Sequence, residues 1–148
     1  MVDPLTFDVS HGQNGLTIVL SSTMEMIDRA DGLVKTLLED RGLAKHAFAV
    51  RVVMREGLTN SVRHAHKKDP FKLIRFNLRI KKDTLTMVIE DQGDGFDWKT
   101  IKAGSRNFLS ADFQKDHGRG FLIMGDYFDS CNYNDKGNIL TLEKNIST

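Results

Sequence analysis

Hydrophobic residues recur along the chain with two different periods. In residues 71–81 every second side chain is apolar, which predicts a half-buried strand because successive side chains of a strand point to opposite faces. The residues "KKD" then form a turn into a second strand of the same pattern. A hairpin at Asn14-Gly15 joins two shorter apolar runs near the N-terminus. Strands are accordingly predicted at 5–9, 16–20, 71–81 and 84–90, and the segments "SCNYN" and "NILTLEK" predict a final hairpin.

Two longer segments have apolar residues three and four positions apart, which is the period of an amphipathic helix. The first runs from Thr23 to about Arg41, and Gly42 is a suitable helix stop. The second runs from about Ala44 to Lys67. A third, short helix is predicted in "GFLIMGDYF".

The order of these elements predicts an α+β fold. Strands linked by hairpins, with the helices clustered between them, favour a mixed, mainly antiparallel sheet with helices packed on one face. A chain of 148 residues has the length of one domain with its own core, so residues 1–148 are expected to form a single domain.

Composition narrows the classes of function. A net charge of +1 gives no general electrostatic case for direct binding of nucleic acid or of an anionic membrane. No apolar run approaches the length of a membrane span, and no signal peptide is evident. Cys131 is the single cysteine and cannot form an internal disulfide, which fits a cytoplasmic protein.

The first candidate site lies on the second predicted helix, in "REGLTNSVRHAH" (55–66). Glu56 and Asn60 are four residues apart and therefore neighbours on one flank, at the border of the apolar arc, while Arg51 and Arg55 are expected to point further round to water. A carboxylate and an amide here could offer oxygen to magnesium, and a partly buried Glu could act as a general base. An ordinary solvated helix flank would contain the same residues.

The second candidate site is "MVIEDQGDGFDWK" (87–99), where a strand ends at Asp91. Gly93 and Gly95 allow positive φ angles and let a flat group approach the backbone, and Asp91 could accept a hydrogen bond from an exocyclic amine. A calcium loop is excluded because its last ligand position holds Lys102 instead of Glu. A simple glycine-rich turn remains possible on these residues alone.

The third candidate site is "HGRGFLIM" (117–124), where Gly118, Arg119 and Gly120 precede a helix. Free N–H groups at a helix start can hold a phosphate, and the arginine adds positive charge. A lone Gly-x-Gly in front of a helix is weak evidence by itself.

Taken in order and spacing, the three motifs resemble the GHKL (histidine-kinase-like) ATPase superfamily. The glutamate-asparagine helix is similar to its N-box, and the two glycine motifs are similar to its glycine boxes. Within the superfamily the motifs look like those of the anti-sigma-factor serine/threonine kinases. The resemblance covers about Leu16 to Lys144 and implies the histidine-kinase-like ATPase fold, with ATP and Mg²⁺ bound.

The resemblance also implies a role for each site residue. Glu56 would be the general base, Asn60 would hold the magnesium, and Asp91 would read the adenine amino group. Gly93 and Gly95 would pack against the adenine. The start of the third helix, namely Gly118, Arg119, Gly120 and Phe121, would wrap the phosphates, and residues 98–117 would form the ATP lid.

Two features depart from the family pattern. Asn138 stands where a threonine often supports the adenine-binding aspartate, and the segment "KTIKAGSRNFLSADFQKD" lacks the proline-containing stretch common in these kinases. With these two departures ATP binding is still expected, but activity that depends on the lid becomes an open question.

The implied partners are a STAS-type antagonist protein, which would be phosphorylated on Ser or Thr, and a sigma factor, which would be held inactive. A homodimer formed through the strand at 16–20 or the helix at 23–41 is possible. Two alternatives stay open: a nucleotide-gated binding module without phosphotransfer, and a detached histidine-kinase catalytic domain.

Overall fold

A computed structural model describes residues 4–95 and 120–147. The strands are β1 (Phe7–Gly12), β2 (Gly15–Ser21), β3 (Leu73–Lys81), β4 (Thr84–Glu90), β5 (Ser130–Tyr133) and β6 (Ile139–Asn145). The helices are α1 (Met24–Asp40), a 3₁₀ turn (Ala44–His46), α2 (Ala47–Asn60), a π-helical segment (Ser61–Ala65) and α5 (Gly120–Tyr127). The expected ATP lid at 98–117 lies outside the described residues.

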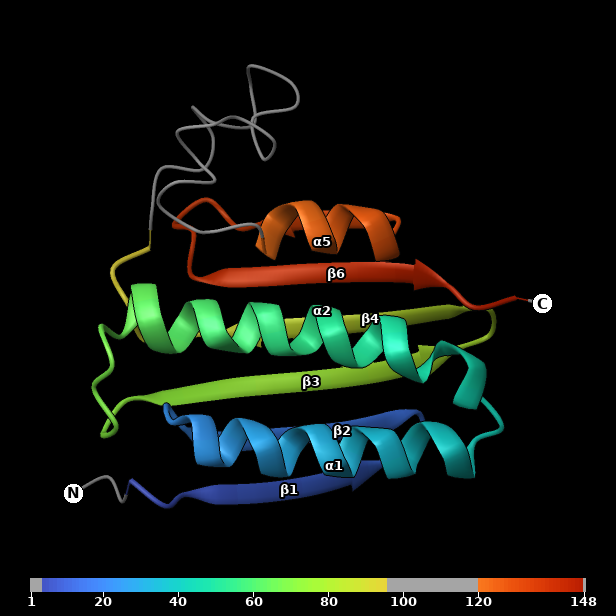
Figure 1. Cartoon of the computed structure of the whole chain (residues 1–148), viewed down its shortest axis with the longest axis horizontal. Coiled ribbons are helices and arrows are strands. Elements are labelled where there is room, and N and C mark those ends of the chain that lie inside the picture. The colour runs from blue at the N-terminus through green and yellow to red at the C-terminus, as the bar shows by residue number, and fades with distance from the viewer. Residues whose placement is uncertain (1–3, 96–119, 148) are drawn as a thin grey trace.

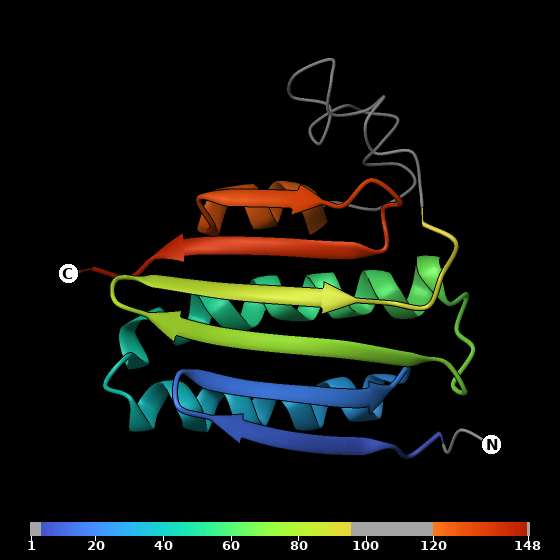
Figure 2. The ribbon, with the colours of Figure 1, turned by 180° about the vertical axis from the view of Figure 1, so that it is seen from behind.

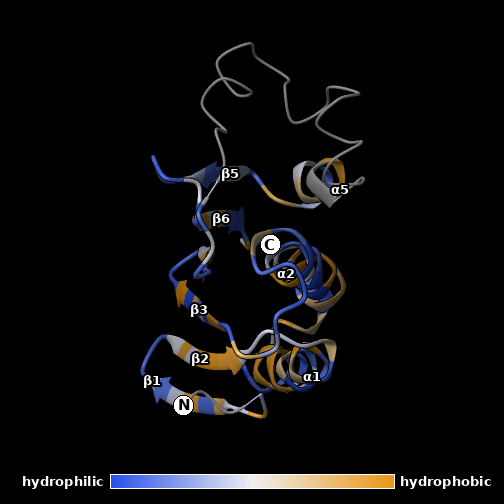
Figure 3. Cartoon of the chain, turned by 90° about the vertical axis from the view of Figure 1, so that its left-hand side faces the viewer, coloured by the Kyte–Doolittle hydropathy of each residue, from blue (hydrophilic) through white to orange (hydrophobic). Residues whose placement is uncertain are grey.

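The strands form one six-stranded sheet in the order β1-β2-β3-β4-β6-β5, and every pairing is antiparallel. The helices α1, α2 and α5 lie on one face of this sheet (Figures 1 and 3), and the opposite face carries no helix among the described elements (Figure 2). The predicted α+β fold with helices on one side is therefore confirmed.

The core fills the space between the sheet and the helices. Alternating residues of β3 and β4 point into it, as their period predicted, and Phe76 at its centre is fully buried. The helices contribute the apolar stripe of α1 and the arc Val50, Val53, Met54 and Leu58 of α2. Figure 3 shows the apolar surfaces of sheet and helices turned toward each other.

Local sequence signals set the ends of α1. The Thr23 side chain caps the helix by accepting a hydrogen bond from the backbone N–H of Met26 at 3.2 Å. Gly42 follows the helix with a φ of 72°, the left-handed conformation that favours glycine at a helix end.

The expectation that Arg51 and Arg55 point to water is wrong. Arg51 Nε lies 2.6 Å from a carboxylate oxygen of Asp31 on α1, and Arg55 Nη1 lies 3.2 Å from the other. Because the Asp31 side chain is nearly buried between the helices, it needs these donors, and the two arginines join α2 to α1.

The sheet order also limits how a second copy could pair with this one. Strand β2, a candidate for dimer contact, pairs with β1 on one side and β3 on the other. Its backbone groups are therefore used within the chain, and β1 is the strand at this edge of the sheet.

None of the helices in the described part of the chain combines the length and the apolar character that a membrane span requires.

Candidate nucleotide site

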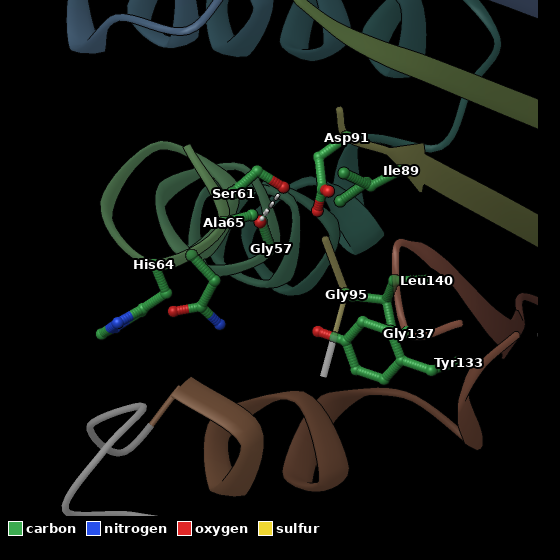
Figure 4. A pocket seen from close by; sticks show the side chains of 11 residues that line it. Gly57, Ser61, His64, Ala65, Ile89, Asp91, Gly95, Tyr133, Gly137 and Leu140 are labelled. Atoms are coloured by element: carbon green, nitrogen blue, oxygen red, sulfur yellow. Dashed lines mark hydrogen bonds between the residues drawn. The ribbon is translucent and has the colours of Figure 1, made fainter. Parts of the chain in front are cut away.

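A pocket opens where the C-terminal end of α2, the end of β4 and the β5–β6 hairpin meet (Figure 4). Three of the predicted site residues, Asn60, Asp91 and Gly95, line it, although Asn60 and Asp91 are 31 positions apart in the chain. The lining residues are Gly57, Asn60, Ser61, His64, Ala65, Ile89, Asp91, Gly95, Tyr133, Gly137 and Leu140. Apolar walls with a few polar groups are typical of a site for a flat organic ligand.

Asp91 follows the last residue of β4, and its carboxyl group points toward the pocket (Figure 4). One carboxyl oxygen accepts the backbone N–H of Gly93 at 2.9 Å. Burial raises the pKa of Asp91 above its usual value, while the hydrogen bonds from the Gly93 N–H and the Ser61 hydroxyl act in the opposite direction. The result is a partly desolvated acceptor, which suits recognition of an amino group on a ring.

Asn60 is the last residue of α2, and the helix changes to π-helical geometry directly after it. The wider turn brings Ser61, His64 and Ala65 into the pocket wall beside Asn60. Such π-helical turns are frequent at functional sites. The sequence predicted a uniform helix to about Lys67, whereas the structure ends the helix at Ala65 and has π-helical geometry over its last turn.

The Asn60 side-chain amide is the best indication that the pocket binds a ligand or an ion. Its nitrogen is buried and has no hydrogen-bond partner among the described residues. Buried polar groups are normally satisfied, so an unsatisfied amide in a pocket wall favours a ligand or ion at that place. Since amide oxygen and nitrogen can exchange by a flip, the group could present oxygen to a hard cation such as Mg²⁺.

The two glycines of the first glycine motif allow segments of the chain itself to approach closely. A Cβ at Gly95, where φ is +81°, would lie 1.8 Å from the carbonyl oxygen of Lys136. A Cβ at Gly93 would lie 2.8 Å from the carbonyl oxygen of Ala65. Gly95 lines the pocket, whereas Gly93 packs behind it against the π-helical segment.

The other predicted site residues are not among the described residues that line the pocket. Glu56 is half-buried on α2, one turn before Asn60, and is not among the described residues that line the pocket. Gly120 is the first residue of α5, which Figure 4 shows across the pocket from α2. Gly118 and Arg119 lie outside the described residues, as does the position of the Phe121 side chain.

Sequence reasoning missed Tyr133, whose ring extends from β5 into the pocket (Figure 4). Burial raises the pKa of its phenol well above the usual value, and Cys131 and Asp91 add to this effect. The hydroxyl therefore stays protonated at neutral pH and offers a donor near Asp91. The sequence did not indicate that Tyr133 lines the pocket, because the other lining residues come from distant segments such as α2 and β4.

Comparison with known proteins agrees with this geometry. The family profile described as "Histidine kinase-like ATPase domain" matches residues 20–144, which is most of the chain. The chain belongs to this family. The antiparallel sheet with helices on one face is the fold expected of this family.

Among curated histidine kinase-like relatives, the chain is similar to proteins named serine-protein kinase RsbW. It is 29% identical over 101 residues to that of Staphylococcus aureus strain RF122 / ET3-1, and 28% identical to that of strain JH9. Each match covers 65% of this chain and 64% of the relative. The chain therefore aligns with slightly less than two thirds of these kinases.

Proposed function

We propose that this protein is an ATP-dependent serine/threonine protein kinase that acts as an anti-sigma factor in a partner-switching pathway. The observation that carries the proposal is the pocket lined by both the half-buried Asp91 carboxyl group and the unsatisfied Asn60 amide. The similarity to serine-protein kinases supports the type of reaction. In this proposal the protein works in the cytoplasm on a STAS-type antagonist and a sigma factor, and it is able to form a homodimer.

The adenine of ATP would enter the apolar part of the pocket. Asp91 would accept a hydrogen bond from the exocyclic amino group, and the side chains of Ile89 and Leu140 would contact the faces of the ring. Gly95 keeps this part of the pocket narrow because the chain passes directly against Lys136. A neighbouring donor, the Tyr133 hydroxyl, suits a ring nitrogen or a bridging water.

The phosphates would extend along α2 toward α5. Asn60 would hold the magnesium ion, which when bound neutralises charge on the phosphates. Gly118, Arg119, Gly120 and Phe121 would surround the phosphates at the start of α5, where helix N–H groups favour anions. Residues 98–117 would close over the nucleotide as a lid.

Phosphoryl transfer to a hydroxyl group needs a proton acceptor. Glu56 lies one turn before Asn60 on the same helix, so both would face the terminal phosphate from one side. Glu56 would accept the proton of the substrate serine or threonine as the oxygen attacks phosphorus. The remaining catalysis is positioning and charge neutralisation, which the other residues supply.

One observation favours a second candidate, a nucleotide-gated binding module that does not transfer phosphate. Glu56 contributes no atom to the pocket as the described residues form it. The same nucleotide contacts would then change the affinity for a partner, and Glu56 would have no catalytic role.

Capture from the protein's own cells tests these candidates. The tagged protein is isolated with Mg-ATP and, separately, with Mg-ADP, and its partners and their new phosphosites are identified by mass spectrometry. A sigma factor together with a STAS-type protein phosphorylated on Ser or Thr would support the kinase. Nucleotide-dependent partners without a phosphosite would support the binding module, and phosphohistidine on a partner would indicate a detached histidine-kinase catalytic domain.

The purified pair then gives a matched test of Glu56. Glu56→Gln should lose transfer of phosphate to the partner while it keeps Mg-ATP binding, because the amide cannot accept the proton. Glu39→Gln, which changes an exposed glutamate on α1, serves as the control. Equal transfer by Glu56→Gln and the wild type would contradict the proposed base.

A further inference from the structure

His66 is buried, with 3% of its surface exposed, at the end of the π-helical segment, and both of its ring nitrogens are engaged. Nε2 lies 2.7 Å from the backbone nitrogen of Gln92, and Nδ1 lies 2.9 Å from the Ser22 hydroxyl oxygen. The histidine thus joins the residue that follows β2 to the residue that follows Asp91. None of the three candidate motifs required a role for it.

These contacts determine the state of the ring. A backbone N–H can only donate, so Nε2 must be the unprotonated acceptor. The proton of the neutral ring is then on Nδ1, which donates to the Ser22 hydroxyl. A second proton on Nε2 would face the Gln92 N–H and break that hydrogen bond.

The Gln92 N–H belongs to the peptide unit that joins Asp91 to Gln92. The carbonyl of the same unit accepts the Asn138 side-chain amide at 3.4 Å. The Gln92 side chain is also held, since its oxygen accepts the backbone N–H of Leu73 at 2.8 Å. The peptide unit directly after Asp91 is therefore held by hydrogen bonds at both its N–H and its carbonyl.

We propose that neutral His66 is a positioning residue for the nucleotide site, acting through the Asp91–Gln92 peptide to orient the Asp91 carboxyl group. The inference rests on the proposed nucleotide binding and extends it. His66 itself does not line the pocket, so in this inference its effect reaches the ligand through this peptide.

Binding should therefore depend on the protonation of His66. Burial lowers the pKa of His66, the positive charge of Lys72 lowers it further, and Asp69 opposes both. These are the charged side chains that face the ring from the segment before β3, while the β2–α1 turn contributes the uncharged Ser22. At neutral pH the ring is neutral and accepts the Gln92 N–H. Nucleotide affinity should fall as the pH drops below the ordinary histidine range and the ring becomes protonated.

Two substitutions of His66 test the role of Nε2 as the acceptor of the Gln92 N–H separately from the contact with Ser22. In His66→Gln the amide oxygen can take the place of Nε2 and cannot titrate. In His66→Asn the shorter side chain can still reach Ser22 but leaves the Gln92 N–H without its acceptor. His46→Asn changes a half-buried histidine beside the Lys144 and Ile146 end of the sheet and serves as the matched control.

Isothermal titration with Mg-ATP at pH 7.5 and pH 5.5 tests the inference. His66→Asn should raise the Kd about fivefold or more at pH 7.5, since a buried donor loses its partner. His66→Gln should stay within about twofold of the wild type at pH 7.5 and should lose less affinity than the wild type at pH 5.5, because it removes the titrating group. His46→Asn should bind as the wild type does at both pH values.

An independent measurement uses the wild-type protein alone. By linkage, a ligand that requires neutral His66 must lower the pKa of His66, so ¹⁵N NMR titration of the ring should show a lower pKa with Mg-ATP than without it. The same spectra should show the proton of the neutral ring on Nδ1. This readout decides the question even if His66→Asn fails to fold.

The possible failures can be distinguished. No binding of Mg-ATP by the wild type would overturn the proposed nucleotide site and the inference with it. Binding by the wild type with an unchanged His66 pKa would overturn the inference alone. Loss of stability in His66→Asn with unchanged Kd would show a merely structural histidine and would also overturn it.

Discussion

The Asn138 side chain holds the backbone of Asp91 and not its carboxyl group. Its amide nitrogen donates to the Asp91 carbonyl oxygen at 3.4 Å, and the Asp91 N–H donates to the Asn138 carbonyl oxygen at 3.0 Å. The carboxyl group accepts instead from the Gly93 N–H at 2.9 Å. The residue that departs from the family pattern thus supports the position of the aspartate through the main chain.

Replacing Asp91 with asparagine should abolish nucleotide binding, because the amide oxygen stays with the Gly93 N–H and an NH2 donor then faces the adenine amino group. For the wild type, Mg-ATP at 100 times its Kd should stabilise the fold by about 2.7 kcal/mol. At this chain length that corresponds to a rise in Tm of roughly 5–10 °C, measured by differential scanning fluorimetry. Asp91→Asn should show no rise, while Asp94→Asn, an exposed neighbour outside the pocket lining, should behave as the wild type. An undiminished rise in Asp91→Asn would refute the adenine contact.

The same variant should not weaken the nucleotide-free protein at pH 7. The folded-state pKa of Asp91 is raised by burial, so its charged form is disfavoured in the fold. A raised pKa contributes stability below the unfolded-state pKa of about 4, and that contribution is lost as the pH rises through the folded-state value. The free energy of unfolding of Asp91→Asn should therefore equal or exceed that of the wild type at pH 7. Urea titrations at pH 7 and pH 4 check this, and the advantage should shrink at pH 4.

Gly95→Ala should cost more stability than Gly42→Ala. Both glycines have a positive φ, which costs an alanine about 1 kcal/mol or more. At Gly42 the space around an added Cβ is open, whereas at Gly95 it meets the Lys136 carbonyl oxygen at 1.8 Å. The difference in unfolding free energy between the two variants, from urea denaturation, measures this close approach. Equal losses would mean that the β5–β6 hairpin moves away without cost.

Asn134 should stabilise the loop that forms one wall of the pocket. Its side-chain oxygen accepts the backbone N–H groups of Gly137, Asn138 and Ile139, each at 3.0 Å. Asn134→Ala should lower the free energy of unfolding by about 1–3 kcal/mol, because the N–H groups of Asn138 and Ile139 lose this acceptor, whereas that of Gly137 keeps the Asn134 backbone carbonyl. Asn134→Asp retains the acceptor and serves as the conservative variant, with a smaller loss expected. Equal urea midpoints for Asn134→Ala and the wild type would contradict this role.

The sequence by itself determined the elements and their order. Alternation in β3 and β4, the helical period of α1 and the Asn14-Gly15 turn are local signals, and each predicted element is present within a few residues of its expected bounds. The motifs also led to the family, because their order and spacing lie in the sequence. Nearby residues were sufficient for these predictions, since they depend on backbone geometry over a few positions.

Only the tertiary structure decided which distant side chains meet. Asp31 with Arg51, His66 with Gln92, and Tyr133 in the wall beside Asp91 are contacts between segments that no periodicity links. The π-helical turn after Asn60 was not predicted either, because the apolar period of the sequence does not distinguish it from a continued α-helix. The sequence placed Asp91 at the end of its strand and Asn60 within its helix. The packing of α2 against the sheet brought the two residues together into one pocket.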